Sequence, residues 1–341
     1  MAEAVEFREK RGQVTRSQLE RILFSDFVEQ WASINKGRLQ PSTRTRYVDC
    51  LAHISEAVGH IYVDALVPSD FRKWVADSLG EGYASATVAG WLRVARLVLD
   101  DAVSDGHLPG NPAKAIKGLT PGRTQGRRGN SLTPEEFRRF LVHVHTCGLA
   151  PDIARMLLVA AWTGCRKGEL LALRFDDYKD GELKIERSVW RRHLKATKTE
   201  DPRRVVVVEP LAAVLNEQRR WLLETQHPAL ATGLMFPANP KHAKAGRIRR
   251  GVDEVSWHRS ENVLDAPLRR VVEAAGITPI SLHSLRRTYE NLLRKAGVDD
   301  LVRRSMAGWR SEGAQRIYAN VDPEERQAAA KALLTLVETA S

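Results

Sequence analysis

Residues 281–290, which read SLHSLRRTYE, place a histidine and an arginine three positions apart. If this stretch is a helix, His283 and Arg286 lie on one face, because residues three and four apart are neighbours on a helix surface. An apolar stripe beside them would face a core, and it consists of Leu282, Leu285 and Leu292. A basic pair on a solvated helix face is common. The pattern therefore indicates a site only if other stretches supply partners.

Three other stretches of the chain supply reactive side chains. The segment TGCRKGELL places Arg166 after a Thr-Gly break, at a new helix start that exposes it. Its Glu169 is spaced to orient a neighbouring arginine. The segment KATKTEDPRR carries Lys198, and MAGWRSEGAQRIYAN carries Trp309 and, nine residues later, Tyr318. The question is which chemistry uses these residue types together.

A phosphodiester under attack suits the two arginines and the histidine. Negative charge gathers on its non-bridging oxygens, and preorganised donors must neutralise that charge. Arginine does so with a planar fork that stays charged, so Arg166 and Arg286 are predicted to clamp the phosphate. The imidazole of His283 has an ordinary pKa near neutrality. It can therefore donate to the phosphate or take the proton of an attacking hydroxyl group.

The order of these motifs resembles that of the tyrosine recombinases, the phage-integrase family of site-specific DNA recombinases. The family signature is an arginine in T-G-x-R-x-x-E-L, a lysine in a β-hairpin, H-x-x-R, and then G-H or G-W before a tyrosine. The resemblance covers about residues 131–325. It extends more weakly to the preceding region, which resembles the core-binding domain of the family and ends in NPA.

The resemblance implies an integrase or excisionase type of enzyme that cleaves and rejoins DNA through a 3′-phosphotyrosine intermediate. No metal or other cofactor is expected. The implied partners are double-stranded DNA recombination sites, with a homotetramer of the chain holding two duplexes. Accessory DNA-bending or directionality proteins are further partners that the resemblance is compatible with.

The resemblance also assigns roles to single residues. Tyr318 stands in QRIYANVDP, where the family has its nucleophile, whereas Tyr289 stands where the family places an aromatic core residue. Lys198, in the usual K-T dipeptide, is the expected general acid for the departing 5′ oxygen, and Lys195 is its rival. Trp309 replaces a second histidine of many members. Its indole can donate to the phosphate but cannot relay a proton, and a purely packing role is the alternative.

Composition and charge support a nucleic-acid partner. The net charge is +11 and the pI is about 9.8. Residues 1–120 balance 15 basic against 15 acidic residues, so the excess lies in the rest of the chain, with 38 basic and 27 acidic residues. No apolar run reaches about 18 residues, no secretory signal is visible, and the three cysteines form no disulfide or zinc pattern. A cytoplasmic, DNA-associated protein is therefore expected.

Helical periodicity and turn residues divide the chain into four parts. We expect a short extension at 1–23, a helical core-DNA-binding domain at 24–118, a linker at 119–130, and a catalytic domain at 131–341. The fold is thus predicted as mainly α with a small β-sheet (α+β), its two domains closing on DNA as a clamp. The strands are expected at GELKIERSVWRRH and RRVVVVEP, with LKATKTEDP as a turn between them. The residues expected to contact DNA are Arg123, Arg127, Arg128 and Arg287.

Two other functions fit parts of the pattern. A type IB topoisomerase-like enzyme would share the catalytic residues, and a silent DNA-binding protein would need only the charge. The last segment, DPEERQAAAKALLTLVE, predicts an amphipathic helix that docks on a neighbouring protomer, which favours a recombinase. Other groups are better explained as structural than as metal or redox sites; they are Asp176, Asp177, Asp180, His143, His145 and Cys165.

Overall fold

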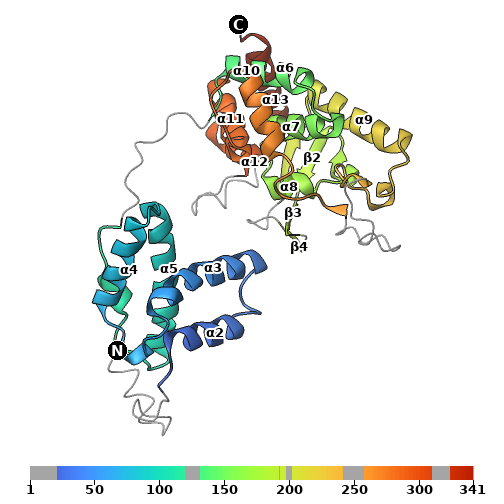
Figure 1. The fold of residues 1–341 in the computed structure, drawn as a ribbon. Coiled ribbons are helices and arrows are strands. Elements are labelled where there is room, and N and C mark those ends of the chain that lie inside the picture. Colours follow the sequence, from blue (N-terminus) through green and yellow to red (C-terminus); the bar gives the residue numbers. More distant parts are fainter. Residues whose placement is uncertain are drawn as a thin grey trace. The chain divides into compact units, whose positions relative to one another are not determined.

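The computed structural model describes residues 21–119, 131–191, 193–196, 202–240, 257–308 and 323–340. The chain divides into two compact units, residues 1–126 and residues 127–341 (Figure 1). The described part is mostly helical with a small sheet, which confirms the predicted fold class. None of the helices within it is long and apolar enough to cross a membrane.

The first unit contains the helical bundle that the sequence predicts. Its helices are α2 (Phe24–Ile34), α3 (Pro41–Val58), α4 (Pro68–Gly80) and α5 (Ser85–Ser104), with the short turns η2 (Val63–Ala65) and η3 (Pro112–Ala115). Prolines begin α3 and α4, where the missing amide hydrogen costs no helical hydrogen bond. The segment of residues 111–116 is hydrogen-bonded to α5. Arg96 donates to the carbonyl oxygen of Ile116 at 2.6 Å, and Asn111 donates to the carbonyl oxygen of Arg96 at 2.8 Å.

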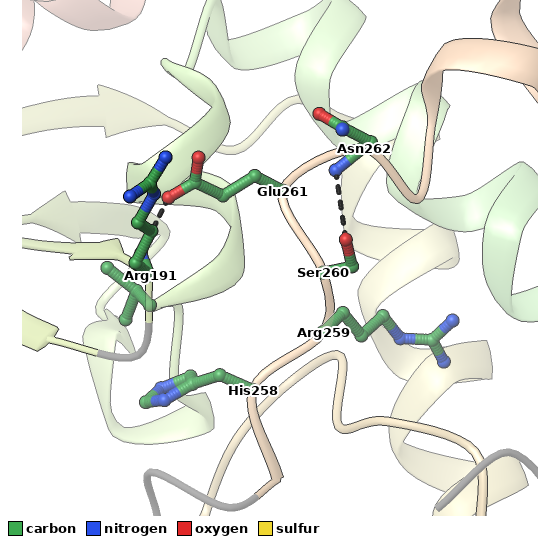
Figure 2. Close-up of a pocket in the computed structure, with 7 residues that line it drawn as sticks. Arg191, His258, Arg259, Ser260, Glu261 and Asn262 are labelled. Carbon is green, nitrogen blue, oxygen red and sulfur yellow. Dashed lines mark hydrogen bonds between the residues drawn. The ribbon is translucent and has the colours of Figure 1, made fainter. Parts of the chain in front are cut away.

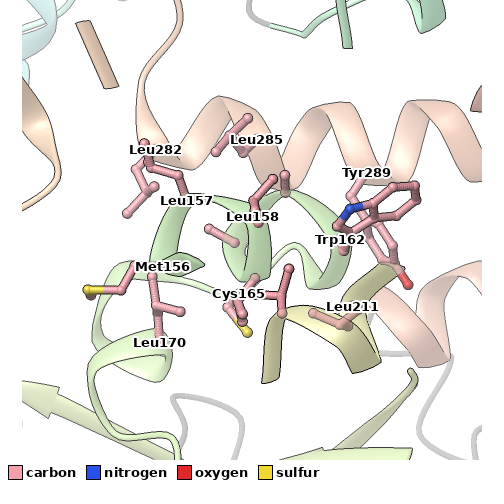
Figure 3. Packing of buried hydrophobic residues seen from close by; sticks show 14 of the residues in the cluster. Met156, Leu157, Leu158, Trp162, Cys165, Leu170, Leu211, Leu282, Leu285 and Tyr289 are labelled. Atoms are coloured by element: carbon pink, nitrogen blue, oxygen red, sulfur yellow. The ribbon is translucent and has the colours of Figure 1, made fainter. Parts of the chain in front are cut away.

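The second unit is built around α7 (Pro151–Thr163), whose sequence is apolar on nearly all sides and is therefore buried. Three helices pack around it: α6 (Pro134–Thr146), α9 (Glu209–Glu224) and α11 (Leu282–Lys295). Figure 3 shows Leu157 and Leu158 of α7 below Leu282 and Leu285 of α11. The remaining elements are α8 (Lys167–Leu171), η4 (Phe175–Asp177), η5 (Leu230–Thr232), α10 (Asp265–Ala275) and α12 (Asp300–Ala307).

The small sheet differs from the prediction at one boundary. β1 (Tyr178–Lys179), β2 (Glu182–Ile185) and β5 (Arg203–Val206) form one antiparallel sheet, and β3 (Arg187–Trp190) pairs with β4 (His193–Ala196). The prediction of LKATKTEDP as a single turn is wrong, because residues 193–196 continue the antiparallel register opposite β3. The hairpin turns earlier, at Arg191, whose φ of 45° is left-handed. Lys198 comes two residues after the end of β4 in the sequence and lies outside the described residues.

The last helix, α13 (Pro323–Glu338), packs on its own unit. It contacts α6, α11, α12 and β5, and it buries Ala329, Ala330, Leu333 and Val337 in the main core. Arg326 donates to the carboxylate of Glu182 in β2 at 2.9 Å. The amphipathic helix predicted for this segment is present. Its predicted docking on a neighbouring protomer would require it to leave this face.

Candidate active site

Arg286 is held where two helices end. The side chain is 1% exposed, and its guanidinium group donates to the carbonyl oxygens of Gly164 at 3.0 Å, of Gly308 at 3.2 Å and of Ala307. Gly164 caps α7 and Gly308 caps α12, both in the left-handed conformation. Helix C-termini present unpaired carbonyl groups and the negative end of the helix dipole, which favour a cation. The fold thus fixes this arginine through backbone carbonyl oxygens at two helix ends.

Tyr289 lies one turn after Arg286 and faces the core. A Cβ atom at Gly164 would lie 2.9 Å from Cδ1 of Tyr289, so only glycine allows this approach. The tyrosine is 1% exposed, and its hydroxyl group has no hydrogen-bond partner among the described residues. Burial raises the pKa of that hydroxyl group. Figure 3 shows the ring beside Trp162. The sequence prediction that Tyr289 is a core residue is confirmed.

Arg166 is oriented by a buried carboxylate. It is the N-cap residue of α8, and its backbone N–H donates to Oε2 of Glu169 at 2.8 Å. Its side chain donates from Nη1 to Oε1 of the same carboxylate at 2.6 Å and is 32% exposed. Arg203, on β5, donates from Nη2 to Oε2 of Glu169 at 2.8 Å and is 7% exposed. The carboxylate of Glu169 therefore lies between two arginines.

The charge balance of this cluster is positive. Burial alone would raise the pKa of Glu169, but Arg203 and Arg166 outweigh it and lower that pKa to about 2. Glu169 is therefore ionised at any working pH. Burial, and then the charges of Arg203 and Arg166, lower the pKa of Arg286 to about 10, which still leaves it protonated near pH 7. Three guanidinium groups and this one carboxylate leave excess positive charge, which an anion would neutralise.

His283 lies on the first turn of α11, one turn before Arg287, and both side chains are exposed. Partial burial lowers the pKa of His283, and the positive charges of Arg287, Arg286 and Arg166 lower it further. The imidazole is therefore mainly neutral at pH 7, so one ring nitrogen is free to accept a proton. The structure brings Arg166, His283 and Arg286 close enough for their charges to interact.

The other predicted site residues lie outside the described part of the chain. They are Lys198, Trp309, Tyr318, Arg123, Arg127 and Arg128. Gly308, whose carbonyl oxygen accepts from Arg286, directly precedes Trp309 in the sequence. Lys195 is the third residue of β4 and pairs with Ser188 of β3.

Sequence reasoning missed Arg203. The available signal was strand alternation, because β5 points Arg203 and Val205 inward and Arg204 outward. An arginine at an inward position needs a buried anionic partner. The carboxylate of Glu169 is that partner. Only the tertiary fold shows that β5 lies beside α8.

The weaker candidates are structural, as expected. Cys165 is buried, accepts a hydrogen bond from the hydroxyl group of Thr163 at 2.9 Å, and has its pKa raised by burial to about 11, so it is not a reactive thiol. Asp177 accepts from the backbone N–H of Arg174 and pairs with Arg187. The described residues contain no cluster of three histidine, cysteine or acidic groups suited to a metal ion.

A separate polar cavity of about 850 Å³ lies between β3 and residues 258–262 (Figure 2). Its side chains serve the local structure. The N–H of Arg191 donates to the carboxylate of Glu261 at 2.7 Å, which links the end of β3 to the loop of residues 258–262. The side chain of Arg259 points away from Arg191 and Glu261. It pairs with Asp152 and donates to the carbonyl oxygen of Pro237 at 2.9 Å. The cavity therefore adds no group to the arginine cluster.

Comparison with known proteins gives one family. The model described as "Phage integrase family" matches residues 130–325, which include every predicted catalytic residue. A search of curated proteins gave no significant match.

Solved structures share the fold at low sequence identity. A lambda integrase fragment, in a dimer bound to a COC′ core site, has a TM-score of 0.65 and 14% identity, covering 89% of this chain and 100% of that chain. The Tn1549 transposon integrase in complex with a circular intermediate DNA has a TM-score of 0.67 and 14% identity, covering 91% and 99%. A lambda integrase tetramer bound to a Holliday junction has a TM-score of 0.64 and 15% identity, covering 85% and 78%.

Proposed function

The chain belongs to the phage integrase family, and from that premise we propose that it is a site-specific DNA recombinase acting through a 3′-phosphotyrosine intermediate. The observation that carries the proposal is the preorganised arginine cluster. Arg166 and Arg286 approach from different helices, and Glu169 neutralises only part of their charge. A phosphodiester is the anion that matches this cluster in a chain with a basic C-terminal region.

In the proposed reaction, Arg166 and Arg286 bind the non-bridging oxygens of the scissile phosphate. The hydroxyl oxygen of Tyr318 attacks phosphorus and forms a phosphotyrosine bond to the DNA 3′ end, while the 5′ oxygen leaves. His283 takes the proton of the tyrosine, and Lys198 gives a proton to the leaving oxygen. Rejoining is the reverse, with a 5′-hydroxyl group as the nucleophile. The clamp supplies fixed charge, so it needs no reorganisation as the phosphate charge develops.

The direct test uses DNA that flanks the gene of this protein, cloned on a supercoiled plasmid. Detergent should trap a covalent protein–DNA adduct. The new 5′ ends should accept label from a polynucleotide kinase without prior phosphatase treatment, because a 3′-phosphotyrosine bond leaves a free 5′-hydroxyl group. New ends that need phosphatase, or no adduct on any flanking fragment, would contradict the proposal.

The pH dependence should report on His283. As the base, His283 must be neutral, so the cleavage rate should be constant near pH 7 to 8. The rate should fall as pH falls through a pKa below its ordinary value of about 6.5. His283→Gln should lower the rate and remove this acid limb. The measurement is single-turnover cleavage at saturating DNA from pH 5 to 8.

The control for this experiment is His145→Gln, on the exposed face of α6. It removes an imidazole that lies outside the proposed site and should keep the wild-type profile. An unchanged acid limb in His283→Gln would exclude this histidine as the titrating base.

The role of Lys198 can be tested with a modified leaving group. Lys198→Ala should cleave normal DNA slowly, because no acid protonates the 5′ oxygen. A 5′-bridging phosphorothiolate leaves as a thiolate that needs no proton, so this substrate should restore cleavage. The single-turnover rates on both substrates are compared. Failure of the rescue would transfer the role to Lys195, and Lys195→Ala is the parallel variant.

The proposed assembly is a homotetramer on two duplexes. The related lambda integrase forms a tetramer on a Holliday junction, and the basic excess of this chain suits extended DNA contact. Arg287 is exposed on α11, one turn after His283, and is proposed to contact phosphates. Arg123, Arg127 and Arg128 of the linker are proposed to do the same. Since α13 packs on its own unit, this helix does not by itself distinguish a recombinase from a topoisomerase. Strand exchange between two duplexes is the readout that separates them.

A further inference from the structure

Arg203 lies at the meeting point of the elements that hold the clamp. Its Nη2 binds the same Oε2 atom of Glu169 that accepts the N–H of Arg166. Its stem lies against Gly308, where a Cβ atom would come within 2.8 Å of Cδ. Gly308 in turn supplies a carbonyl oxygen to Arg286 at 3.2 Å. One side chain of β5 therefore touches the supports of both clamp arginines.

We propose that Arg203 is a positioning residue of the phosphate clamp, which keeps the carboxylate of Glu169 shared between two arginines and supports the α12 terminus that holds Arg286. The inference rests on the proposed function and adds a residue to its machinery. Arg203 touches neither DNA nor the reacting atoms in this proposal. It acts through Glu169 and Gly308.

The sharing of Glu169 has a consequence for Arg166. With Arg203 present, one carboxylate oxygen is occupied from β5, and the cluster keeps excess positive charge for the phosphate. Without Arg203, the full carboxylate charge falls on Arg166 and pairs with it one to one. Arg166 is then held by Glu169 in place of the phosphate. The loss of Arg166 as a phosphate donor destabilises the transition state more than the ground state, because the phosphate carries its extra negative charge only in the transition state.

Packing alone does not explain this arginine. Its Nε atom is buried and has no hydrogen-bond partner among the described residues. An apolar side chain of similar length would fill the same space without that unpaired donor. The charge of the guanidinium group is therefore the property that the site uses.

A pH readout separates this role from a structural one. The charged or titratable groups that interact with Glu169 are Arg166, Arg203, Arg286 and Cys165, and Tyr289 lies near Arg203. Two of the arginines hold the pKa of Glu169 down, so removal of Arg203 lets burial raise that pKa. Glu169 then becomes protonated as the pH falls toward the mildly acidic range. Without Arg203, ionised Glu169 holds Arg166 away from the phosphate, and protonated Glu169 no longer orients Arg166 at all. The cleavage rate therefore falls further as Glu169 becomes protonated, and the acid limb extends to higher pH than in the wild type.

The experiment compares Arg203→Met, Arg203→Lys and Arg204→Met in the full-length protein. Arg204 neighbours Arg203 on β5, but its side chain is 52% exposed and 3.5 Å from the carboxylate of Glu182. It therefore controls for the loss of one positive charge from the strand. Single-turnover cleavage is measured at saturating DNA from pH 5 to 8, and circular dichroism checks the fold at each pH.

Arg203→Met should lower the rate at pH 7.5 by roughly 10²-fold, as expected for a misplaced clamp group, and shift the acid limb upward. Arg203→Lys, which keeps the charge, should recover most of the rate and restore the limb. Arg204→Met should match the wild type. A wild-type rate and profile in Arg203→Met, or a lysine variant as impaired as the methionine variant, would overturn this role. No adduct with the wild type would instead overturn the proposed function.

Discussion

Tyr318→Phe should abolish the covalent protein–DNA complex while leaving DNA affinity near the wild-type value. The phenylalanine ring keeps the size of the side chain but has no oxygen to attack phosphorus, so no phosphotyrosine bond can form. DNA affinity depends on many phosphate contacts elsewhere on the chain and should persist. The adduct is measured with a nicked suicide substrate on a denaturing gel. Gel shifts give the affinity.

The matched control is Tyr289→Phe. The hydroxyl group of Tyr289 is buried and has no partner among the described residues, so its removal leaves no hydrogen bond broken there. This variant should fold and cleave like the wild type. An adduct retained in Tyr318→Phe, or lost in a folded Tyr289→Phe, would reverse the assignment of the nucleophile.

Local sequence signals predicted the elements that carry the site. The apolar stripe of α11 and the Thr-Gly break after α7 both lie within a few residues, and helix periodicity and glycine conformation are local properties. The pairing of Arg286 with the ends of α7 and α12 was not predictable. The carbonyl groups of Gly164 and Gly308 are far apart in sequence, and they meet only once the core has formed.

Two other features depended on long-range packing. Turn residues in LKATKTEDP favoured a loop, but pairing with β3 extends the strand through residues 193–196. The apolar face of α13 was correctly predicted, yet the pattern does not say which surface covers it. A helix that buries Leu333 and Val337 can satisfy them on its own chain or on a second one. The sequence shows that this apolar face must be covered, but it does not show whether the covering surface belongs to the same chain or to a second one.

Arg286→Lys should fold and yet cleave DNA more slowly by roughly 10² to 10³, the range for loss of one preorganised donor. Lysine keeps the positive charge but lacks the planar fork, so it cannot bind helix-end carbonyl groups and a phosphate oxygen together. Arg286→Ala should in addition lower the free energy of unfolding. It leaves the buried carbonyl groups of Gly164 and Ala307 without this donor, at a cost of about 1–3 kcal/mol for each group that remains unpaired.

Urea unfolding and single-turnover cleavage at saturating DNA separate these two effects. Arg294→Ala is the control on the same helix, because its side chain is exposed in the last turn of α11, away from the site. It should change neither the free energy of unfolding nor the saturated cleavage rate by more than a small amount. The decisive comparison is Arg286→Lys at a stability close to that of the wild type. A wild-type cleavage rate in that variant would show that the buried guanidinium group supports only the fold, and the phosphate clamp would then rest on Arg166 alone.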